Sequence, residues 1–342
     1  MGVELVLGSS GAGKTHYIYD KITDSDVKER FFAVVPEQYT METQKKIVSM
    51  CRKKGGSELA AGSLNIDIVS FNRLAVRLFE ETGAAPGDIL DDTGKVMVLR
   101  KVMEQEKDNL SIFKSKISYA GFVDEVKSLI SEFYQYGIDN EKIGELEEKA
   151  ASKPVLQSKL HDIRIIESAF RNYLSDKYIT SEELMDKLCK AIPKSSLIRN
   201  STITLDGYTG FTTLQYRVIE ELIRYAKDVI VTVTISPDAI GAEDNELGDL
   251  FALSNKTISK IEKIANDNNY KVKKTVLKEA KPYRYADREE ICWLEKNLFS
   301  YKATKYENEV NHIKVVEAGN QDDECKYIAS AINHYVREVG YR

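Results

Sequence analysis

The feature that most constrains this chain is residues 8–15, Gly-Ser-Ser-Gly-Ala-Gly-Lys-Thr, which match G-x-x-x-x-G-K-[ST]. In such a loop backbone N–H groups point at phosphate oxygens, the lysine supplies a positive charge, and the final hydroxyl can ligate Mg²⁺. An apolar run at residues 3–7 precedes the loop and helix-compatible residues 15–22 follow it, as a phosphate-binding loop requires. We therefore predict a nucleotide site, the alternative being a glycine-rich turn without a ligand. Its residues are Gly8, Ser9, Ser10, Gly11, Ala12, Gly13, Lys14 and Thr15.

Further apolar runs indicate that this loop belongs to a parallel sheet. Strands are expected at 31–35, 66–69, 201–205, 229–235, 270–277 and 313–316, and most are separated by runs with helical spacing. Between residues 88 and 193 no convincing strand is found, and apolar residues recur at helical spacing. The predicted fold is an α/β P-loop sheet flanked by helices, with a large all-helical insertion. Its parts are the first P-loop segment (1–87), the insertion (88–200), the second segment (201–282) and a truncated further domain (283–342).

The composition limits the class of protein. With 42% hydrophobic residues the chain can bury a large core, and no apolar run approaches the roughly 20 residues of a membrane span. The amino terminus enters a core strand directly, so a cytoplasmic location without membrane contact is expected. The four cysteines and four histidines are scattered, which favours ordinary reduced thiols over a zinc or cluster site. The net charge of −5 leaves the partner open.

Asp206, at the end of the predicted strand 201–205, is a second candidate for the nucleotide site. In P-loop ATPases such an aspartate holds Mg²⁺, and a following glutamate commonly activates the attacking water. The next residue here is Gly207, which has no group that can polarise water. We therefore predict that Thr15 and Asp206 bind Mg²⁺, that there is no catalytic residue, and that hydrolysis is slow or absent. Alternatively, Asp206 and Gly207 only form a turn after the strand.

Five blocks of sequence resemble the amino-terminal part of the AddB (RexB) family, the second subunits of bacterial AddAB helicase–nucleases. The blocks are residues 8–15, Val35-Pro-Glu-Gln-Tyr-Thr40, Ile68-Val-Ser-Phe-Asn-Arg-Leu74, Asp206-Gly-Tyr-Thr-Gly-Phe-Thr212, and Glu324–Ala329 running into Val336–Arg342. The P-loop is generic, whereas V-P-E-Q-[YF]-T and L-D-G-[YF]-T-x-F-T are quite specific to this family. The blocks follow family order over nearly the whole chain.

The resemblance implies a RecA-like fold of helicase superfamily 1 (UvrD/RecB-like) in which motor function has decayed. It also implies a subunit that binds ATP, Mg²⁺ and DNA, and that helps an AddA-type partner, in a heterodimer, to process double-strand breaks for recombinational repair. Members scan for the recombination hotspot Chi and carry a carboxy-terminal nuclease with an iron–sulfur cluster. Neither the nuclease motif nor the cluster cysteines match residues here, so both are expected beyond Arg342.

Two departures from active superfamily 1 helicases bear on mechanism. These helicases place an adenine-reading glutamine ahead of the P-loop, but only seven residues precede Gly8. They also carry G-D-x-x-Q, whose glutamine senses the γ-phosphate, where this chain reads Val231-Thr-Val-Thr-Ile-Ser-Pro-Asp238. Because this sensor and the general base are both missing, we expect bound nucleotide to have a structural or regulatory role.

DNA contacts are predicted after strands 31–35 and 66–69, because the carboxyl ends of parallel strands face the ligand edge of such a sheet. Amide, hydroxyl and aromatic groups there can hold a single strand. The candidates are Gln38, Tyr39, Thr40, Ser70, Phe71 and Asn72. An equally weighted alternative is that Phe71 belongs to the core and that residues 36–40 form a strand exit with a helix cap.

Three other functions stay open at this point. A self-sufficient helicase motor is disfavoured by Gly207 and the missing G-D-x-x-Q. A small-molecule or nucleotide kinase is disfavoured by the long helical insertion and the lack of an arginine-rich lid. A non-enzymatic scaffold with a vestigial P-loop would fail to bind ATP.

Overall fold

The computed structural model describes residues 2–24, 29–54, 65–83, 88–175, 178–242, 250–278, 284–299 and 304–341. The chain forms two compact units, Met1–Ala280 and Lys281–Arg342. The first unit contains a parallel sheet, the helices that cover it, and a helical insertion. In the described part of the chain, no helix combines the length and the apolar character needed to cross a membrane.

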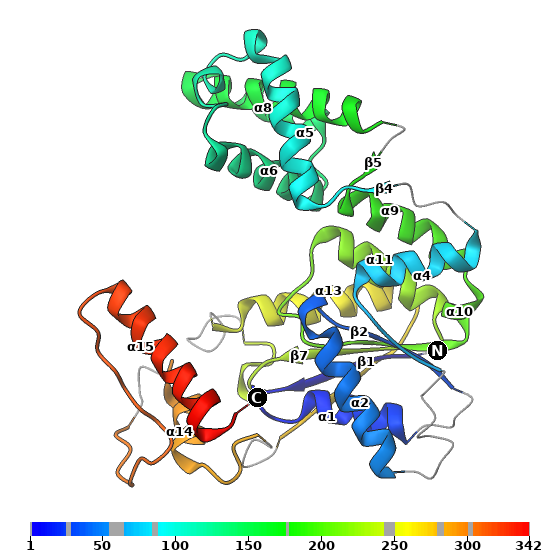
Figure 1. The fold of residues 1–342 in the computed structure, drawn as a ribbon. Helices are drawn as coiled ribbons and strands as arrows, with labels where there is room; N and C mark the ends of the chain where they lie inside the picture. Colours follow the sequence, from blue (N-terminus) through cyan, green and yellow to red (C-terminus); the bar gives the residue numbers. More distant parts are fainter. Residues whose placement is uncertain are drawn as a thin grey trace. The chain divides into compact units, whose positions relative to one another are not determined.

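Six strands form one parallel sheet in the described residues, which confirms the predicted α/β fold (Figure 1). They are β1 (Gly2–Gly8), β2 (Arg30–Val34), β3 (Ile66–Val69), β6 (Ser201–Leu205), β7 (Asp228–Thr234) and β8 (Val272–Val276). Their spatial order is β3-β2-β6-β7-β1-β8, so β1 lies in the interior of the sheet between β7 and β8. Helices cover both faces, and for that reason the strands read as nearly continuous apolar runs.

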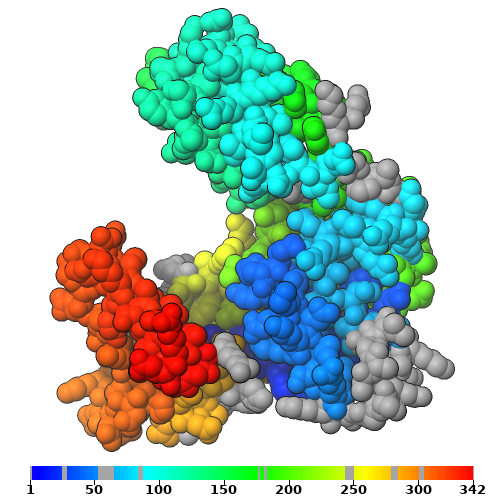
Figure 2. All heavy atoms as spheres, in the orientation of Figure 1, coloured from blue at the N-terminus to red at the C-terminus, as the bar shows by residue number. Residues whose placement is uncertain are grey.

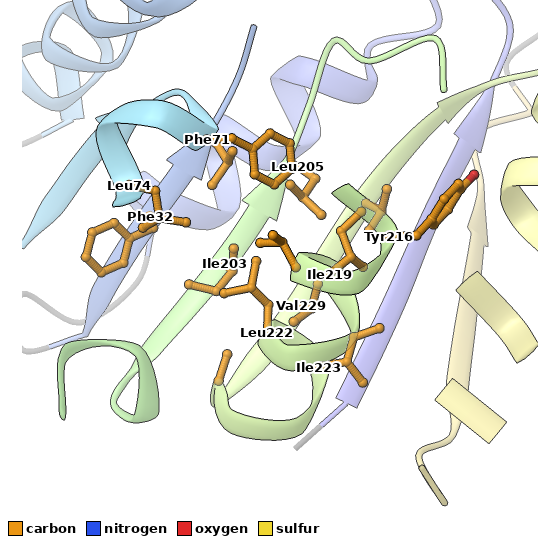
Figure 3. Close-up of a cluster of buried hydrophobic side chains, with 14 of the residues drawn as sticks. Phe32, Phe71, Leu74, Ile203, Leu205, Tyr216, Ile219, Leu222, Ile223 and Val229 are labelled. Carbon is orange, nitrogen blue, oxygen red and sulfur yellow. The ribbon is translucent and has the colours of Figure 1, made fainter. Parts of the chain in front are cut away.

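Helices cover both faces of the sheet, and each face has its own hydrophobic core. Figure 1 shows α1 and α2 on one face and α4, α11 and α13 on the other. The bounds are α1 (Lys14–Thr23), α2 (Thr40–Lys54), α4 (Phe71–Thr82), α9 (Ser181–Ala191), α10 (Ser196–Arg199), α11 (Thr213–Tyr225) and α13 (Ala252–Asp267). On the larger core, side chains of α4 and α11 meet those of β2, β6 and β7 (Figure 3). The strand contributions include Phe32, Ile203, Leu205 and Val229, all at most 1% exposed.

The predicted helical insertion has a hydrophobic core of its own. It consists of α5 (Asp92–Gln105), α6 (Ala120–Gln135), α7 (Asn140–Lys149) and α8 (Pro154–Leu174). Their buried side chains form one cluster, and the residues of these helices gather into one lobe in Figure 2. Residues 140–149 form α7, whose Ile143 is fully buried.

Two features of the insertion differ from expectation. The short strands β4 (Asp88–Ile89) and β5 (Tyr178–Ile179) pair in parallel within a region where no strand was predicted. Two residues are too few to show a period, so only the tertiary structure reveals this pair. In addition, α9 and α10 lie within residues 88–200, yet their apolar side chains join the core of the sheet.

The second unit contains α14 (Glu289–Asn297), α15 (Gln321–His334) and a π-helical turn (Tyr335–Val339) among its described residues. The strand expected at 313–316 is wrong, because these residues form no regular structure and Val315 is 91% exposed. An apolar run becomes a strand only where a neighbouring strand can take its hydrogen bonds. Short 3₁₀ turns complete the described elements: η1 (Glu37–Tyr39), η2 (Lys107–Asn109), η3 (Phe113–Ser115), η4 (Ile192–Lys194) and η5 (Pro237–Ala239).

Candidate nucleotide-binding and nucleic-acid-binding site

All predicted site residues lie in segments that leave the same edge of the sheet. Because the strands are parallel, the segments that follow β1, β2, β3 and β6 start from one edge. These segments carry the P-loop, residues 35–40, residues 70–72 and residues 206–212 respectively. Ligands of open α/β sheets bind at this edge.

The P-loop has the backbone shape that its glycines predict. Gly11 and Gly13 have φ values of 76° and 93°, in the left-handed region that favours glycine. Gly13 caps α1, so the N–H groups of the first helical turn face the loop. The Lys14 amine folds back and donates hydrogen bonds to the carbonyl oxygens of Gly8 and Ser9, both at 2.8 Å. The loop therefore brings together backbone N–H donors, the N-terminus of α1 and the Lys14 amine. These groups fit a phosphate ligand.

Asp206 is held at the edge by a neighbouring strand. It is 7% exposed, and the Thr232 hydroxyl of β7 donates a 2.6 Å hydrogen bond to its Oδ1. Thr232 is in register with Val6 of β1, so Asp206 lies two strands, or about 10 Å, from the P-loop strand. The role of this carboxylate as a Mg²⁺ ligand stays a prediction.

Gly207 has a backbone conformation that redirects any side chain placed there. Its φ is +80°, and a Cβ added to it would lie 3.5 Å from Pro36 and 3.7 Å from Tyr39. Both residues follow β2, which lies on the opposite side of β6 from β7 and β1. A side chain at position 207 would therefore start away from the P-loop. Position 207 therefore carries no side chain that could act as a base, and its backbone would also direct an added side chain away from the P-loop.

We expect Gly207→Glu to leave nucleotide turnover undetectable and to lower the free energy of unfolding by about 1–2 kcal/mol, because a non-glycine residue in the left-handed region is strained. Phosphate release and urea denaturation test the two parts. Gly121→Glu is the matched control, because Gly121 lies in the first turn of α6 with open space around it. ATP turnover in Gly207→Glu would show that this side chain can reach the attacking water after all.

Residues 208–211 bring aromatic side chains to the same edge. The ring centroids of Tyr208 and Phe71 are 5.6 Å apart, and those of Tyr208 and Phe211 are 5.1 Å apart. Burial and then the negative charge of Glu37 raise the pKa of Tyr208, so its hydroxyl stays protonated at physiological pH. Tyr208 was not among the predicted contacts, although an aromatic residue inside a family-specific block was a usable signal.

Glu37 joins the two segments that were predicted to contact DNA. Its Oε2 accepts a 2.7 Å hydrogen bond from the Ser70 hydroxyl, and its Oε1 lies 3.3 Å from Arg73 Nε. The Glu37 carbonyl oxygen also accepts a 2.8 Å hydrogen bond from the Thr40 hydroxyl. Ser70 additionally caps α4 by accepting a hydrogen bond from the Arg73 N–H. These contacts hold the exits of β2 and β3 in one arrangement.

The six predicted contact residues divide by exposure. Gln38, Tyr39 and Asn72 are exposed, whereas Thr40, Ser70 and Phe71 are buried at 5–7% exposure. A cavity of about 250 Å³ opens beside them, here called the edge cavity. Its lining comprises Pro36, Glu37, Ser70, Phe71, Asn72, Gln135, Met185, Tyr208, Thr212, Leu214 and Gln215. The structure thus brings the residues after β3 together with Tyr208 and with a glutamine of the insertion that no sequence signal marked.

The sheet order, with a glycine-rich loop after an interior strand and an aspartate two strands away, defines a RecA-like α/β protein. The sequence model of the family described as "ADDB, N-terminal" matches residues 5–295. The chain therefore belongs to this family, as the resemblance predicted.

Individual relatives agree with the family match. The chain is 39% identical to the B subunit of the ATP-dependent helicase/deoxyribonuclease of Lachnoclostridium phytofermentans, over 100% of this chain and 30% of that protein. It is 32% identical to the protein of the same name from Thermoanaerobacter sp. (strain X514), over 100% of this chain and 29% of the relative. The Clostridium perfringens (strain 13 / Type A) protein of that name is 29% identical, with the same coverage. The chain thus spans about 30% of the length of these curated relatives.

Proposed function

We propose that this chain is the helicase-like, nucleotide- and DNA-binding part of the second subunit of a heterodimeric helicase–nuclease. In this role it would assist an AddA-type subunit in processing double-strand breaks for recombinational repair. The observation that supports the proposal most is the common sheet edge, which carries the P-loop and Asp206 as well as the aromatic and amide groups of the edge cavity. Family membership and the names of the relatives point the same way.

ATP with Mg²⁺ is the proposed ligand of the P-loop. Lys14 would exchange the carbonyl oxygens of Gly8 and Ser9 for phosphate oxygens, while Thr15 and Asp206 hold the metal. Because position 207 offers no general base, the nucleotide would be held and not turned over. A ligand present at about a hundred times its Kd adds about 2.7 kcal/mol to the stability of the folded state, which suits a structural or regulatory nucleotide.

Single-stranded DNA is the proposed ligand of the edge cavity. Phe71 and Tyr208 provide an aromatic floor, and Asn72 and Gln135 provide amide groups that can pair with base edges. Gln38 and Tyr39 are exposed beside these residues, on the segment that Glu37 fastens to Ser70. Buried Thr40, Ser70 and Phe71 would act mainly by shaping the site.

The experiment is single-strand binding by fluorescence anisotropy, with and without ATP and Mg²⁺. We expect Tyr39→Ala and Asn72→Ala each to weaken binding about tenfold, because stacking on an aromatic ring contributes about 1–3 kcal/mol per base. Tyr119→Ala is the control, since Tyr119 is also exposed but begins α6, at the other end from Gln135. Equal affinities of all three variants would contradict the proposed contacts.

Measurements of ATP turnover and of nucleotide binding, each with and without the single strand, separate the other functions. ATP turnover stimulated by the single strand would indicate a self-sufficient motor, and a failure to bind nucleotide would indicate a scaffold with a vestigial P-loop. The nuclease and its iron–sulfur cluster, which the family resemblance implies, have no candidate residues in this sequence.

A further inference from the structure

A second cavity, of about 480 Å³, lies between α5 and α6 of the insertion and is here called the α5–α6 groove. Its lining is polar and comprises Asp92, Lys95, Lys127, Ser128, Ser131, Glu132, Gln135 and Tyr136. Gln135 lines both this groove and the edge cavity. The two hollows therefore share one lining side chain.

Two lysines in the groove are withdrawn from solvent. The side chain of Lys95 is 5% exposed and that of Lys127 is 18% exposed, whereas lysine side chains usually extend into water. Both amines approach the carboxylate of Asp92, at 4.0 Å and 3.4 Å, and this carboxylate is 76% exposed. The two cations thus converge on one point at the mouth of the groove, where a second anion can exchange with Asp92.

The edge cavity lacks the amines that Lys95 and Lys127 supply in the groove, where they lie with the carboxylates of Asp92 and Glu132. Among the described residues that line the edge cavity there is no lysine and no arginine, and its one charged group is the carboxylate of Glu37. Such a surface suits bases, which stack and form hydrogen bonds, but it gives no electrostatic attraction to phosphates. Proteins that hold single strands combine stacking groups with a positively charged groove that follows the backbone.

We propose that the α5–α6 groove binds the phosphodiester backbone of the single strand whose bases occupy the edge cavity. This inference rests on the proposed function of the edge cavity. Lys127 and Lys95 would bind a phosphate in place of the Asp92 carboxylate, and the hydroxyl of Ser131 would donate a further hydrogen bond. The helical insertion thereby lengthens the binding site beyond the sheet edge.

The test compares oligonucleotides of about 4 and about 16 nucleotides, within the range of site sizes known for single-strand binders. For the longer oligonucleotide, we expect Lys127→Gln to weaken binding about tenfold, the effect of one charged hydrogen bond. The plot of log K against log salt should become shallower by about 0.7, because one phosphate contact is lost. Binding of the shorter oligonucleotide, which the edge cavity can hold alone, should change little.

Asp92→Asn should act in the opposite direction. It removes one of the two carboxylates of the groove, the one that both lysines approach, so the longer oligonucleotide should bind more tightly. The cap of α5 survives this change, because the Asp91 side chain accepts the hydrogen bond from the Gly94 N–H. Lys101→Ala is the control, since Lys101 lies on α5 outside the groove with its amine over the Tyr173 ring. Thermal melting of each variant shows whether it is folded.

The outcomes distinguish this inference from the function on which it rests. If the unaltered chain binds single strands and neither Lys127→Gln nor Asp92→Asn changes the affinity or the salt slope, the groove proposal is wrong and the edge cavity still stands. If the unaltered chain binds no single strand of either length, the proposed function fails and the groove proposal fails with it.

Discussion

Lys14→Ala is expected to weaken binding of ATP with Mg²⁺ by about a hundredfold, because at least one charged hydrogen bond worth about 1.5–3 kcal/mol is lost. Isothermal titration of the purified chain measures this directly. In the nucleotide-free loop the same amine holds the carbonyl oxygens of Gly8 and Ser9. The substitution should therefore also loosen the loop, which hydrogen exchange at residues 8–15 would detect.

Lys46→Ala is the matched control for this prediction. Lys46 is also a helical lysine, but it lies on α2, is about half exposed and pairs with Glu42 one turn away. Its removal should leave nucleotide affinity unchanged. If Lys14→Ala bound ATP as tightly as the unaltered chain does, the loop would not be a phosphate site, and the scaffold interpretation would gain support.

Asp162→Ala is expected to lower the stability of the helical insertion by about 3–5 kcal/mol, because alanine would leave several buried donors without partners, each at a cost of about 1–3 kcal/mol. Asp162 lies on α8, is completely buried, and accepts four hydrogen bonds. The donors are the N–H groups of Ser111, Ile112 and Phe113 and the Ser111 hydroxyl, at 2.8–2.9 Å. Urea denaturation followed by hydrogen exchange at residues 111–113 measures the loss and locates it.

Asp162→Asn should be intermediate, because its amide keeps one acceptor oxygen and turns a donor toward the backbone N–H groups. Asp108→Ala is the control, since Asp108 is 94% exposed and pairs with Lys114 at the surface of the same lobe. Its removal should change stability little. Equal stabilities of the Asp162 and Asp108 variants would show that the hydrogen bonds of Asp162 to residues 111–113 do not stabilise the insertion.

Most of the helices and strands could be predicted from the sequence, because the signal for each lies within a few neighbouring residues. The P-loop glycines, the apolar strands and the helical spacing of the insertion can each be recognised within about ten residues. The common edge of the site followed from one further rule, that successive parallel strands end on the same side. The strand predicted at 313–316 is wrong because pairing depends on a neighbour that the local pattern does not contain.

Glu4 is an example of a residue whose environment local sequence patterns cannot predict. It interrupts the apolar run of β1, and burial by itself raises the pKa of its carboxyl. Hydrogen bonds from Lys21, Thr275, Lys273 and Tyr17 outweigh burial and lower this pKa to about 2. Two of these partners are about 270 residues away along the chain, on the adjacent strand β8. The packing of both α1 and β8 against β1 makes a charge at position 4 tolerable.

The sequence by itself determined the P-loop motif, the glycine after Asp206, the α/β class and the existence of a helical insertion, because each depends on neighbouring residues. The tertiary structure alone decided that Gly207 faces Pro36 and Tyr39, that Glu37 fastens Ser70, and that Gln135 lines both the edge cavity and the α5–α6 groove. These contacts join residues 33 to more than 170 positions apart. Sheet order and packing bring such residues together, and no local period records them.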